Sequence, residues 1–243
     1  MKWFIELCDK FHFVFIEGDR YKQIFNGLWT TLEITFFALI IGIVIGVVIA
    51  TIRSTYDKNV EVLKRKKGPG FIVLSILNVI AKLYLTVIRG TPTVVQLLIA
   101  YFVIFESATN GVPVAIFAFG INSGAYVAEI LRGGIMSIPN GQFEASRSLG
   151  FNYIQTMSYV IIPQVFKSVL PALCNEFIVL IKETSVAGYV GVNDLTKAGD
   201  LIRGRTFEAM LPLLGVAAIY LALVVVLTSL VGVLERRLRT NER

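Results

Sequence analysis

The sequence predicts an all-α integral membrane protein with five transmembrane helices, and three observations carry this prediction. Hydrophobic residues make up 55% of the 243 residues and charged residues only 16%, well below the roughly 25% typical of soluble domains. The mean hydropathy is +0.71. Several uncharged stretches approach the length of about 20 residues that an α-helix needs to cross the hydrocarbon core.

Residues 1–24 are predicted to form an external N-terminal segment. Acidic and basic side chains recur through it, so it contains no apolar core of the kind found in signal peptides. A transmembrane domain of residues 25–235 is expected to follow, and residues 236–243 form a basic tail. Much of the excess positive charge lies beside apolar spans, at 64–67 and 236–239, which argues against nucleic-acid binding.

Four spans are clear in the sequence: 34–52, 112–128, 164–181 and 209–234. The first and last are uncharged or nearly so, whereas 164–181 contains Lys167 and Glu176. The region 71–105 is harder to interpret, because Lys82 and the Arg89-Gly90-Thr91-Pro92 sequence divide it.

Charge distribution decides how region 71–105 is interpreted. Basic residues concentrate on the cytoplasmic side of membrane proteins, so the loop 53–70 and the C-terminal tail are both expected there. A single crossing at 92–106 satisfies this rule, with the N-terminus outside and the C-terminus cytoplasmic. Segment 71–89 is then predicted to be an interfacial or cytoplasmic helix, with Lys82 and Arg89 snorkelling towards water.

The third span is followed by a polar, helix-forming insert. Turn residues at 138–141 end the span, and Asn140 is expected to cap a helix over 142–149. Gly150 suits a left-handed position after that helix. Asn152 is expected to cap a second helix over 153–162, which ends or kinks at Pro163. The sequence therefore predicts a helix–glycine–helix elbow within a cytoplasmic loop, 136–163.

The outer part of this elbow is predicted to carry the small residues Ala145 and Ser146, with Glu144 and Arg147 giving polar contacts. On composition alone, an ordinary solvated loop is the better interpretation. The order of residues changes this view. The run Glu144-Ala145-Ser146-Arg147-Ser148-Leu149-Gly150 and the downstream proline resemble the cytoplasmic EAA loop of ABC importer permeases, although Ser146 stands where a second alanine is frequent.

The resemblance extends over most of the chain. Segments 27–32, 89–92, 123–135 and 175–185 are similar, in order, to the four core helices of permeases in the polar amino-acid uptake branch of this family. It implies a type I ABC importer permease (MetI-like) fold in a bacterial cell membrane. The implied partners are a dimer of ABC ATPase subunits, a second permease copy or paralogue, and an extracytoplasmic solute-binding protein.

The same resemblance assigns the ATPase-coupling role to five residues of the elbow. They are Glu144, Ala145, Ser146, Arg147 and Gly150. ATP and Mg²⁺ are expected on the partner ATPase, with no cofactor in this chain. The sequence contains no GxxxxGK[ST] phosphate loop, so this subunit is not expected to be an enzyme. A passive channel or a membrane scaffold is the alternative that needs no coupling elbow.

A substrate site is predicted from polar residues within the spans, because a charge there costs about 2.5–3.5 kcal/mol and calls for a partner or a wet cavity. The candidates are Glu176, Asn175, Asn122, Ser123 and Gln96. A carboxylate would favour an ammonium or guanidinium group, and the resemblance favours arginine, lysine or histidine. The alternative is structural: Glu176 pairs with Lys167, Lys182 or Arg132 and holds helices together.

Two further patterns bear on helix packing. Gly42, Gly46 and Ala50 form a stripe of small residues that suits close helix packing, within one subunit or between two. Glu129 and Arg132 lie three apart and are expected to pair on one helix face. The lone histidine, His12, has no acidic or cysteine cluster near it in sequence, so no metal site is predicted.

Overall fold

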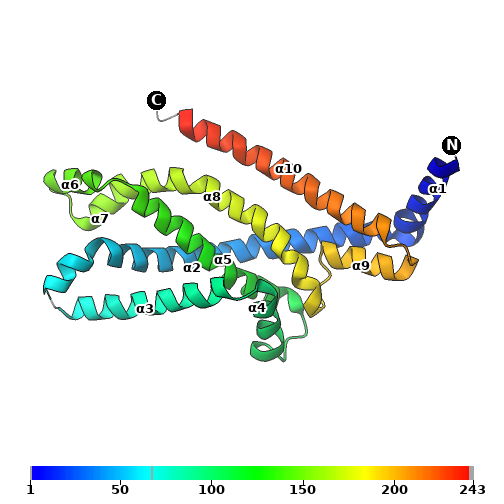
Figure 1. The fold of residues 1–243 in the computed structure, drawn as a ribbon, viewed down its shortest axis with the longest axis horizontal. Helices are drawn as coiled ribbons and strands as arrows, with labels where there is room; N and C mark the ends of the chain where they lie inside the picture. Colours follow the sequence, from blue (N-terminus) through cyan, green and yellow to red (C-terminus); the bar gives the residue numbers. More distant parts are fainter. Residues whose placement is uncertain (1, 67, 241–243) are drawn as a thin grey trace. The chain divides into compact units, whose positions relative to one another are not determined.

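The structure is a computed structural model of the chain that describes residues 2–66 and 68–240. The described residues are helical with short connections (Figure 1). The chain divides into two compact units. Unit 1 comprises the residues up to 38, 93–119 and 177–230; unit 2 comprises 39–92, 120–176 and the residues from 231 onwards.

Ten α-helices follow one another along the described part of the chain. They are α1 Lys2–Phe11, α2 Arg20–Lys66, α3 Pro69–Gly90, α4 Thr93–Ile99, α5 Gly111–Ser137, α6 Asn140–Ser148, α7 Tyr153–Gln155, α8 Ile162–Glu183, α9 Leu195–Thr206 and α10 Met210–Thr240. π-helical turns occur at His12–Ile16, Ala100–Ile104 and Thr156–Ile161, and 3₁₀ turns at Glu17–Asp19 and Thr184–Val190. Part of the predicted basic tail belongs to α10, whereas its residues 241–243, like Lys67 of the basic loop, lie outside the described residues.

Within the described residues, five helices are long and apolar enough to cross a membrane: Ile5–Lys58, Pro69–Gly90, Gly111–Ser137, Tyr153–Val190 and Met210–Leu238. The predicted number is therefore confirmed. The second helix was predicted at 92–106, and this position is wrong, because Thr93–Ile104 is a shorter apolar helix whereas Pro69–Gly90 has 22 residues. Lys82 and Arg89 lie on α3 without interrupting it. The break comes at Thr91, which is extended as expected for a residue before proline.

In unit 2 the second part of α2 packs closely against α5. A Cβ atom added to Gly46 would lie 2.4 Å from Cγ1 of Val127, and one added to Gly42 would lie 3.0 Å from Cβ of Ser123. Ala50, the third member of the stripe, is buried. The small-residue stripe therefore packs inside this subunit. α3 lies along the same part of α2 (Figure 1), where Arg53 Nη1 donates to Asn78 Oδ1 at 3.1 Å.

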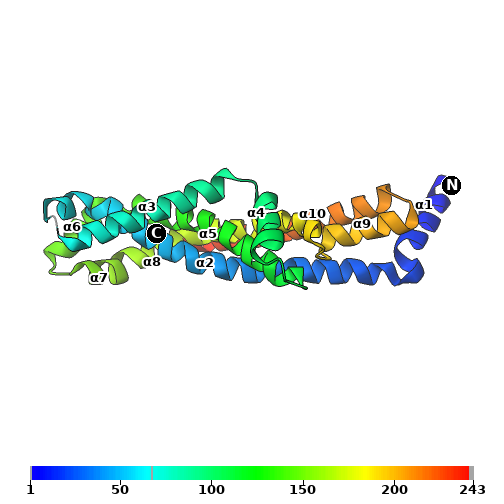
Figure 2. The same ribbon diagram turned by 90° about the horizontal axis from the view of Figure 1, so that it is seen from below.

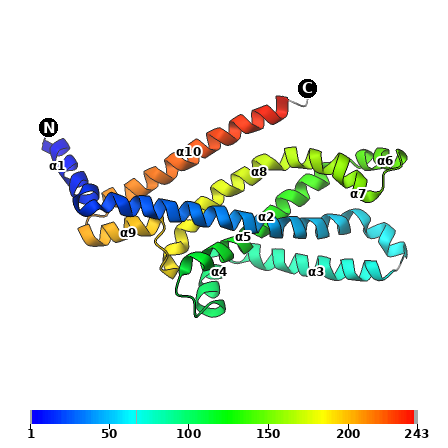
Figure 3. The ribbon, with the colours of Figure 1, turned by 180° about the vertical axis from the view of Figure 1, so that it is seen from behind.

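In unit 1, α9 lies beside the N-terminal part of α2 (Figure 3). The core here consists of Val14, Ile24, Leu195, Ala198, Ile202 and Val216. Asp194 caps α9, because its carboxylate accepts hydrogen bonds from the backbone N–H groups of Thr196 and Lys197. Burial raises the pKa of the Asp194 carboxyl, and the capping hydrogen bonds oppose this shift. Leu195 N–H donates to Thr31 Oγ1 at 3.1 Å and joins α9 to α2.

Candidate functional site

Two of the predicted substrate residues meet in unit 2. The hydroxyl of Ser123, on α5, donates to Oε1 of Glu176, on α8, at 3.0 Å. Ser123 is fully buried and Glu176 is 8% exposed. A carboxylate is costly to bury away from water. Glu176 therefore marks a position where a polar side chain is present although an apolar one would cost less to bury.

Close packing around α5 fixes the position of Ser123. A Cβ atom on Gly124 would lie 2.9 Å from Cβ of Ile45 and from Oη of Tyr84. The same hydroxyl of Tyr84 donates to the carbonyl oxygen of Ile121 at 2.6 Å. The absence of a side chain at positions 42 and 124 therefore lets α2 and α3 approach α5 around Ser123.

The other three predicted substrate residues are placed differently. Asn122 precedes Ser123 on α5 and is 1% exposed. Asn175 is exposed, on the face of α8 next to the buried Glu176. Gln96 is half-buried on α4 and belongs to unit 1. Within unit 2 the structure thus places three of the predicted residues, Asn122, Ser123 and Glu176, in the interior.

Charged residues of unit 2 form a network that the sequence predicted only in part. Arg132 contacts Glu129 and Asp57 through separate Nη atoms, each at 3.3 Å, and Arg89 lies 3.8 Å from Glu129. The predicted pairing of Glu129 with Arg132 is confirmed. Arg132 is also one of the predicted partners of Glu176, but its ion pairs go to Glu129 and Asp57. The sequence does not predict Asp57 or Arg89 as members of this network, because both are remote from α5 in the chain. Asp57, for example, lies 75 positions before Arg132.

The predicted elbow is present at one end of unit 2 (Figures 1 and 2). α6 ends at Ser148 with Leu149 as its C-cap, and Gly150 adopts the predicted left-handed conformation with φ of +86°. Phe151 N–H donates to the carbonyl oxygen of Ser146 at 3.1 Å, and Gly150 N–H donates to that of Arg147 at 2.9 Å. This pair of hydrogen bonds is a Schellman motif, which satisfies carbonyl groups at the end of the helix.

Asn152 caps the second helix as predicted, and does so reciprocally. Gln155 N–H donates to Asn152 Oδ1, and Asn152 N–H donates to Gln155 Oε1, both at 2.9 Å. Of the two predicted outcomes at Pro163, an end or a kink, the helix does not end there, because the chain stays helical through the π turn Thr156–Ile161 into α8. A π turn just before Pro163 changes the helical register where proline cannot donate.

Asn140 does not cap α6, contrary to the prediction. It lies inside the first turn of α6, and its Oδ1 atom accepts a hydrogen bond from Nζ of Lys58 at 2.8 Å. The same ammonium group lies 4.6 Å from the centre of the Phe143 ring. Lys58 thereby connects the far end of α2 to the elbow. Sequence alone gave no signal for this contact across 82 positions.

Four of the five predicted coupling residues are exposed. They are Glu144, Ala145, Arg147 and Gly150. Ser146 is the exception: it is 3% exposed, and its hydroxyl donates to the carbonyl oxygen of Gln142. It therefore does not lie on the outer part of the elbow as predicted. Two large apolar side chains that were not predicted are highly exposed there, Leu149 at 78% and Ile154 at 73%.

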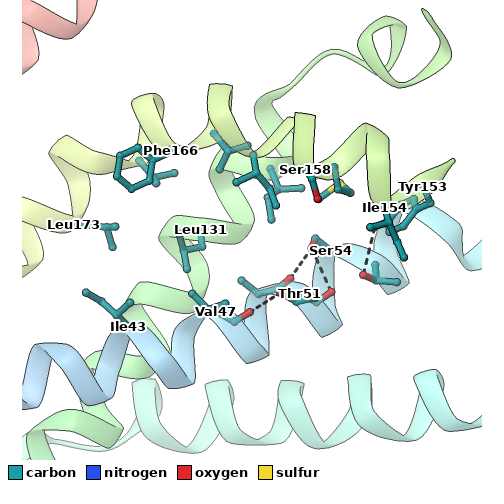
Figure 4. Close-up of a pocket in the computed structure, with 17 residues that line it drawn as sticks. Ile43, Val47, Thr51, Ser54, Leu131, Tyr153, Ile154, Ser158, Phe166 and Leu173 are labelled. Atoms are coloured by element: carbon teal, nitrogen blue, oxygen red, sulfur yellow. Dashed lines mark hydrogen bonds between the residues drawn. The ribbon is translucent and has the colours of Figure 1, made fainter. Parts of the chain in front are cut away.

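Behind the elbow, α7 and α8 face α2 and α5 across an apolar groove of about 400 Å³. Figure 4 shows Val47 and Thr51 of α2 on one side, with Phe166 of α8 on the other. At the elbow end the hydroxyls of Thr55 and Tyr153 lie 3.5 Å apart. The elbow side is anchored to α5 by a buried cluster of Ile138, Ile161, Val165 and Val169.

Comparisons with known proteins identify the family to which the chain belongs. Residues 70–240 match the family described as "Binding-protein-dependent transport system inner membrane component". The chain is 37% identical to the arginine transport system permease protein ArtQ of Bacillus subtilis, covering 67% of this chain and 76% of that protein. It is 40% identical to the glutamine transport system permease protein GlnP of Escherichia coli, covering 68% and 77%.

Solved structures give the same result. A crystal structure of an amino acid ABC transporter with histidines is 37% identical, has a TM-score of 0.78, and is matched over 92% of this chain and 98% of that chain. A structure of the MetNI methionine ABC transporter, at 22% identity, shares the fold with a TM-score of 0.71. The chain therefore belongs to the inner-membrane components of binding-protein-dependent transport systems, and within that family it is a multi-pass amino-acid ABC permease.

Proposed function

We propose that this permease forms the pathway of an ATP-driven importer of basic amino acids. The observation that carries the substrate class is the buried carboxylate of Glu176, held by Ser123 between α5 and α8. In a membrane interior a carboxylate attracts a cationic partner, because charges there require compensation. The guanidinium, ammonium or imidazolium group of arginine, lysine or histidine supplies that charge.

The comparisons support an amino-acid cargo and leave a choice of side chain. One relative is named for arginine, another for glutamine, and a third, the TcyB permease of Bacillus subtilis, for L-cystine. The α-ammonium of any amino acid can also approach a carboxylate. Glu176 therefore favours basic amino acids only if its charge faces the side chain of the cargo, and this condition is what the experiment tests.

The exposed elbow supplies the proposed coupling to a separate ATPase dimer. Glu144 and Arg147 offer charged contacts, and Leu149 offers an exposed apolar side chain that a partner would bury. ATP and an extracytoplasmic binding protein would each stabilise one membrane state more than the other, and so shift the population between them. This proposal places the elbow and the C-terminus in the cytoplasm and the N-terminus outside a bacterial inner membrane.

The test is substrate-stimulated ATPase activity of the permease purified with its ATPase partner and binding protein in lipid. Arginine, lysine, histidine, glutamine and cystine are compared for wild type and for Glu176→Gln. We expect stimulation by basic amino acids to fall about tenfold or more, since a hydrogen bond to a charged group contributes about 1.5–3 kcal/mol. Glu33→Gln, at a half-buried carboxylate on α2, is the matched control and should retain stimulation.

Each part of the proposal has its own contradicting result. Stimulation by glutamine alone that survives Glu176→Gln would keep the importer and make the Glu176 carboxylate structural. Purification without any nucleotide-binding subunit, together with passive flux of amino acids, would contradict ATP-driven import.

A further inference from the structure

A second, polar pocket of about 450 Å³ lies in unit 2 between α2, α3 and α5. Its charged and hydroxyl groups come from five side chains: Arg53, Lys82, Thr86, Arg89 and Glu129. Lys82, Thr86 and Arg89 follow one another at helical spacing on one face of α3. Neither Ser123 nor Glu176 lines this pocket, so it is separate from the candidate substrate site.

The positive charge of this pocket exceeds the negative charge available to it. Glu129, the one carboxylate in the lining, already contacts Arg132 and Arg89. Lys82 is exposed and makes no ion pair with a carboxylate among the residues whose side chains the structure describes. Arg53 donates Nη1 to Asn78, but its buried Nε–H meets no acceptor in the described part of the chain. The pocket therefore holds uncompensated cations and a hydrogen-bond donor ready for an anion.

The sequence indicates where this pocket lies relative to the membrane. Arg53 is the first charged residue after the uncharged run 34–52, and Glu129 is the first after 107–128. On α2 and α5 the pocket therefore lies at the ends of the uncharged runs, and from α3 the long side chains of Lys82 and Arg89 can extend towards lipid headgroups. Beside Lys82, the apolar side chains of Val79 and Leu83 on α3 are 63% and 62% exposed, a surface that suits acyl chains.

We propose that this pocket binds the phosphate group of an anionic phospholipid through Arg53, Lys82 and Arg89. Guanidinium and ammonium groups are the usual partners of phosphate oxygens, and basic pockets between membrane helices on the cytoplasmic side bind lipid headgroups. Thr86 also lines the pocket, but its hydroxyl already donates to the carbonyl oxygen of Lys82 at 2.9 Å, so the phosphate contacts come from the three cations. Inorganic phosphate offers the same chemistry without the acyl chains, so the experiment separates the two sources.

The test uses the purified permease in neutral detergent and measures lipid binding by native mass spectrometry. Phosphatidylglycerol is titrated against phosphatidylcholine, with and without inorganic phosphate as competitor. We expect phosphatidylglycerol to bind wild type more tightly, and Lys82→Gln to lower that preference about fivefold, the effect of one basic residue near a headgroup. Lys82→Arg should preserve the preference. Lys167→Gln, which removes an exposed lysine from α8, is the matched control and should leave it unchanged.

The arms give distinct outcomes. Preference for phosphatidylglycerol that Lys82→Gln alone removes supports a lipid site. A second outcome is that inorganic phosphate binds wild type but not Lys82→Gln, while neither protein prefers phosphatidylglycerol. This result would keep the phosphate chemistry of the pocket and make the ligand a free anion and not a lipid. Equal losses in Lys82→Gln and Lys167→Gln would overturn the proposal, because they would show unspecific attraction to surface charge. Equal binding of both lipids with no effect of phosphate would overturn it as well.

Discussion

Residues without functional groups position the buried carboxylate of this permease. Ser123, which donates to Glu176, lies on the part of α5 that packs against α2, and that close approach depends on Gly42 and Gly46 of the small-residue stripe. Side chains at these positions would have to occupy space already filled by Ser123 and Val127. Small residues have the same use between membrane helices generally, since helices in lipid associate largely by close packing.

Gly46→Ala should therefore destabilise the protein although alanine is the better helix former. The new Cβ would lie 2.4 Å from Cγ1 and 2.7 Å from Cβ of Val127, and overpacking of this kind costs about 1–3 kcal/mol. The measurement is thermal unfolding of the purified permease in detergent. Combining Gly46→Ala with Val127→Ala should recover part of the lost stability, because Val127→Ala removes Cγ1 and leaves Cβ in place.

Gly133→Ala is the matched control for this prediction. Gly133 lies on α5, and a Cβ atom added there would meet nothing within 4 Å. Its substitution should be neutral or stabilise by about 0.5–1 kcal/mol, the usual difference between glycine and alanine inside a helix. Equal behaviour of Gly46→Ala and Gly133→Ala would contradict the close packing of α2 against α5.

Among the helical elements, the elbow is the one whose form the sequence predicted best. Gly150 and Asn152 act through local rules: a left-handed residue ends α6, and a capping box begins α7. Both rules operate within a few residues, so sequence alone suffices to apply them. This turn sets the directions of the two short helices that carry the proposed coupling face.

Gly150→Ala should strain the elbow without creating any clash. A Cβ atom at Gly150 would meet nothing within 4 Å, so the destabilisation comes only from the backbone φ of +86°. A residue other than glycine in this left-handed conformation costs about 1–2 kcal/mol. We expect weaker substrate-stimulated ATPase activity and faster proteolysis of the loop 136–163. Gly141→Ala, at a helical position of α6 with equally open surroundings, should change neither measurement.

Elsewhere the sequence failed where long-range contacts decide the outcome. Asn140 looked like a helix cap, but Lys58 of α2 binds its side chain. Lys82 and Arg89 looked like interruptions of an apolar span, yet α3 runs through both. Ser146 looked like a surface residue of the elbow, but it is buried. The outcome in each case depends on a contact with a residue remote in sequence or on which face of a helix packs inwards. Local composition reveals neither the remote contact nor the buried face.

At the scale of the whole molecule, two helices, α5 and α8, each connect the elbow to the candidate substrate site. Ser123 lies 14 residues before the end of α5 at Ser137, and Glu176 lies 14 residues after the start of α8 at Ile162. At a rise of 1.5 Å per residue, each is about 21 Å from the elbow. A movement of α6 and α7 would thus act on Ser123 and Glu176 through helical arms of equal length.

Glu144→Lys tests whether a partner uses this path. Glu144 is exposed on α6, so reversing its charge should leave folding and the unfolding temperature unchanged. A docked ATPase subunit would instead meet a like charge or lose a polar contact, and like-charge juxtaposition at an interface costs several kcal/mol. Transport-linked ATPase activity of the reconstituted complex should therefore fall at least tenfold. Glu17→Lys, the same change at an exposed residue near the N-terminus, should have no such effect. Full coupled activity in Glu144→Lys would show that the elbow does not carry the ATPase contact, whatever the role of Glu176.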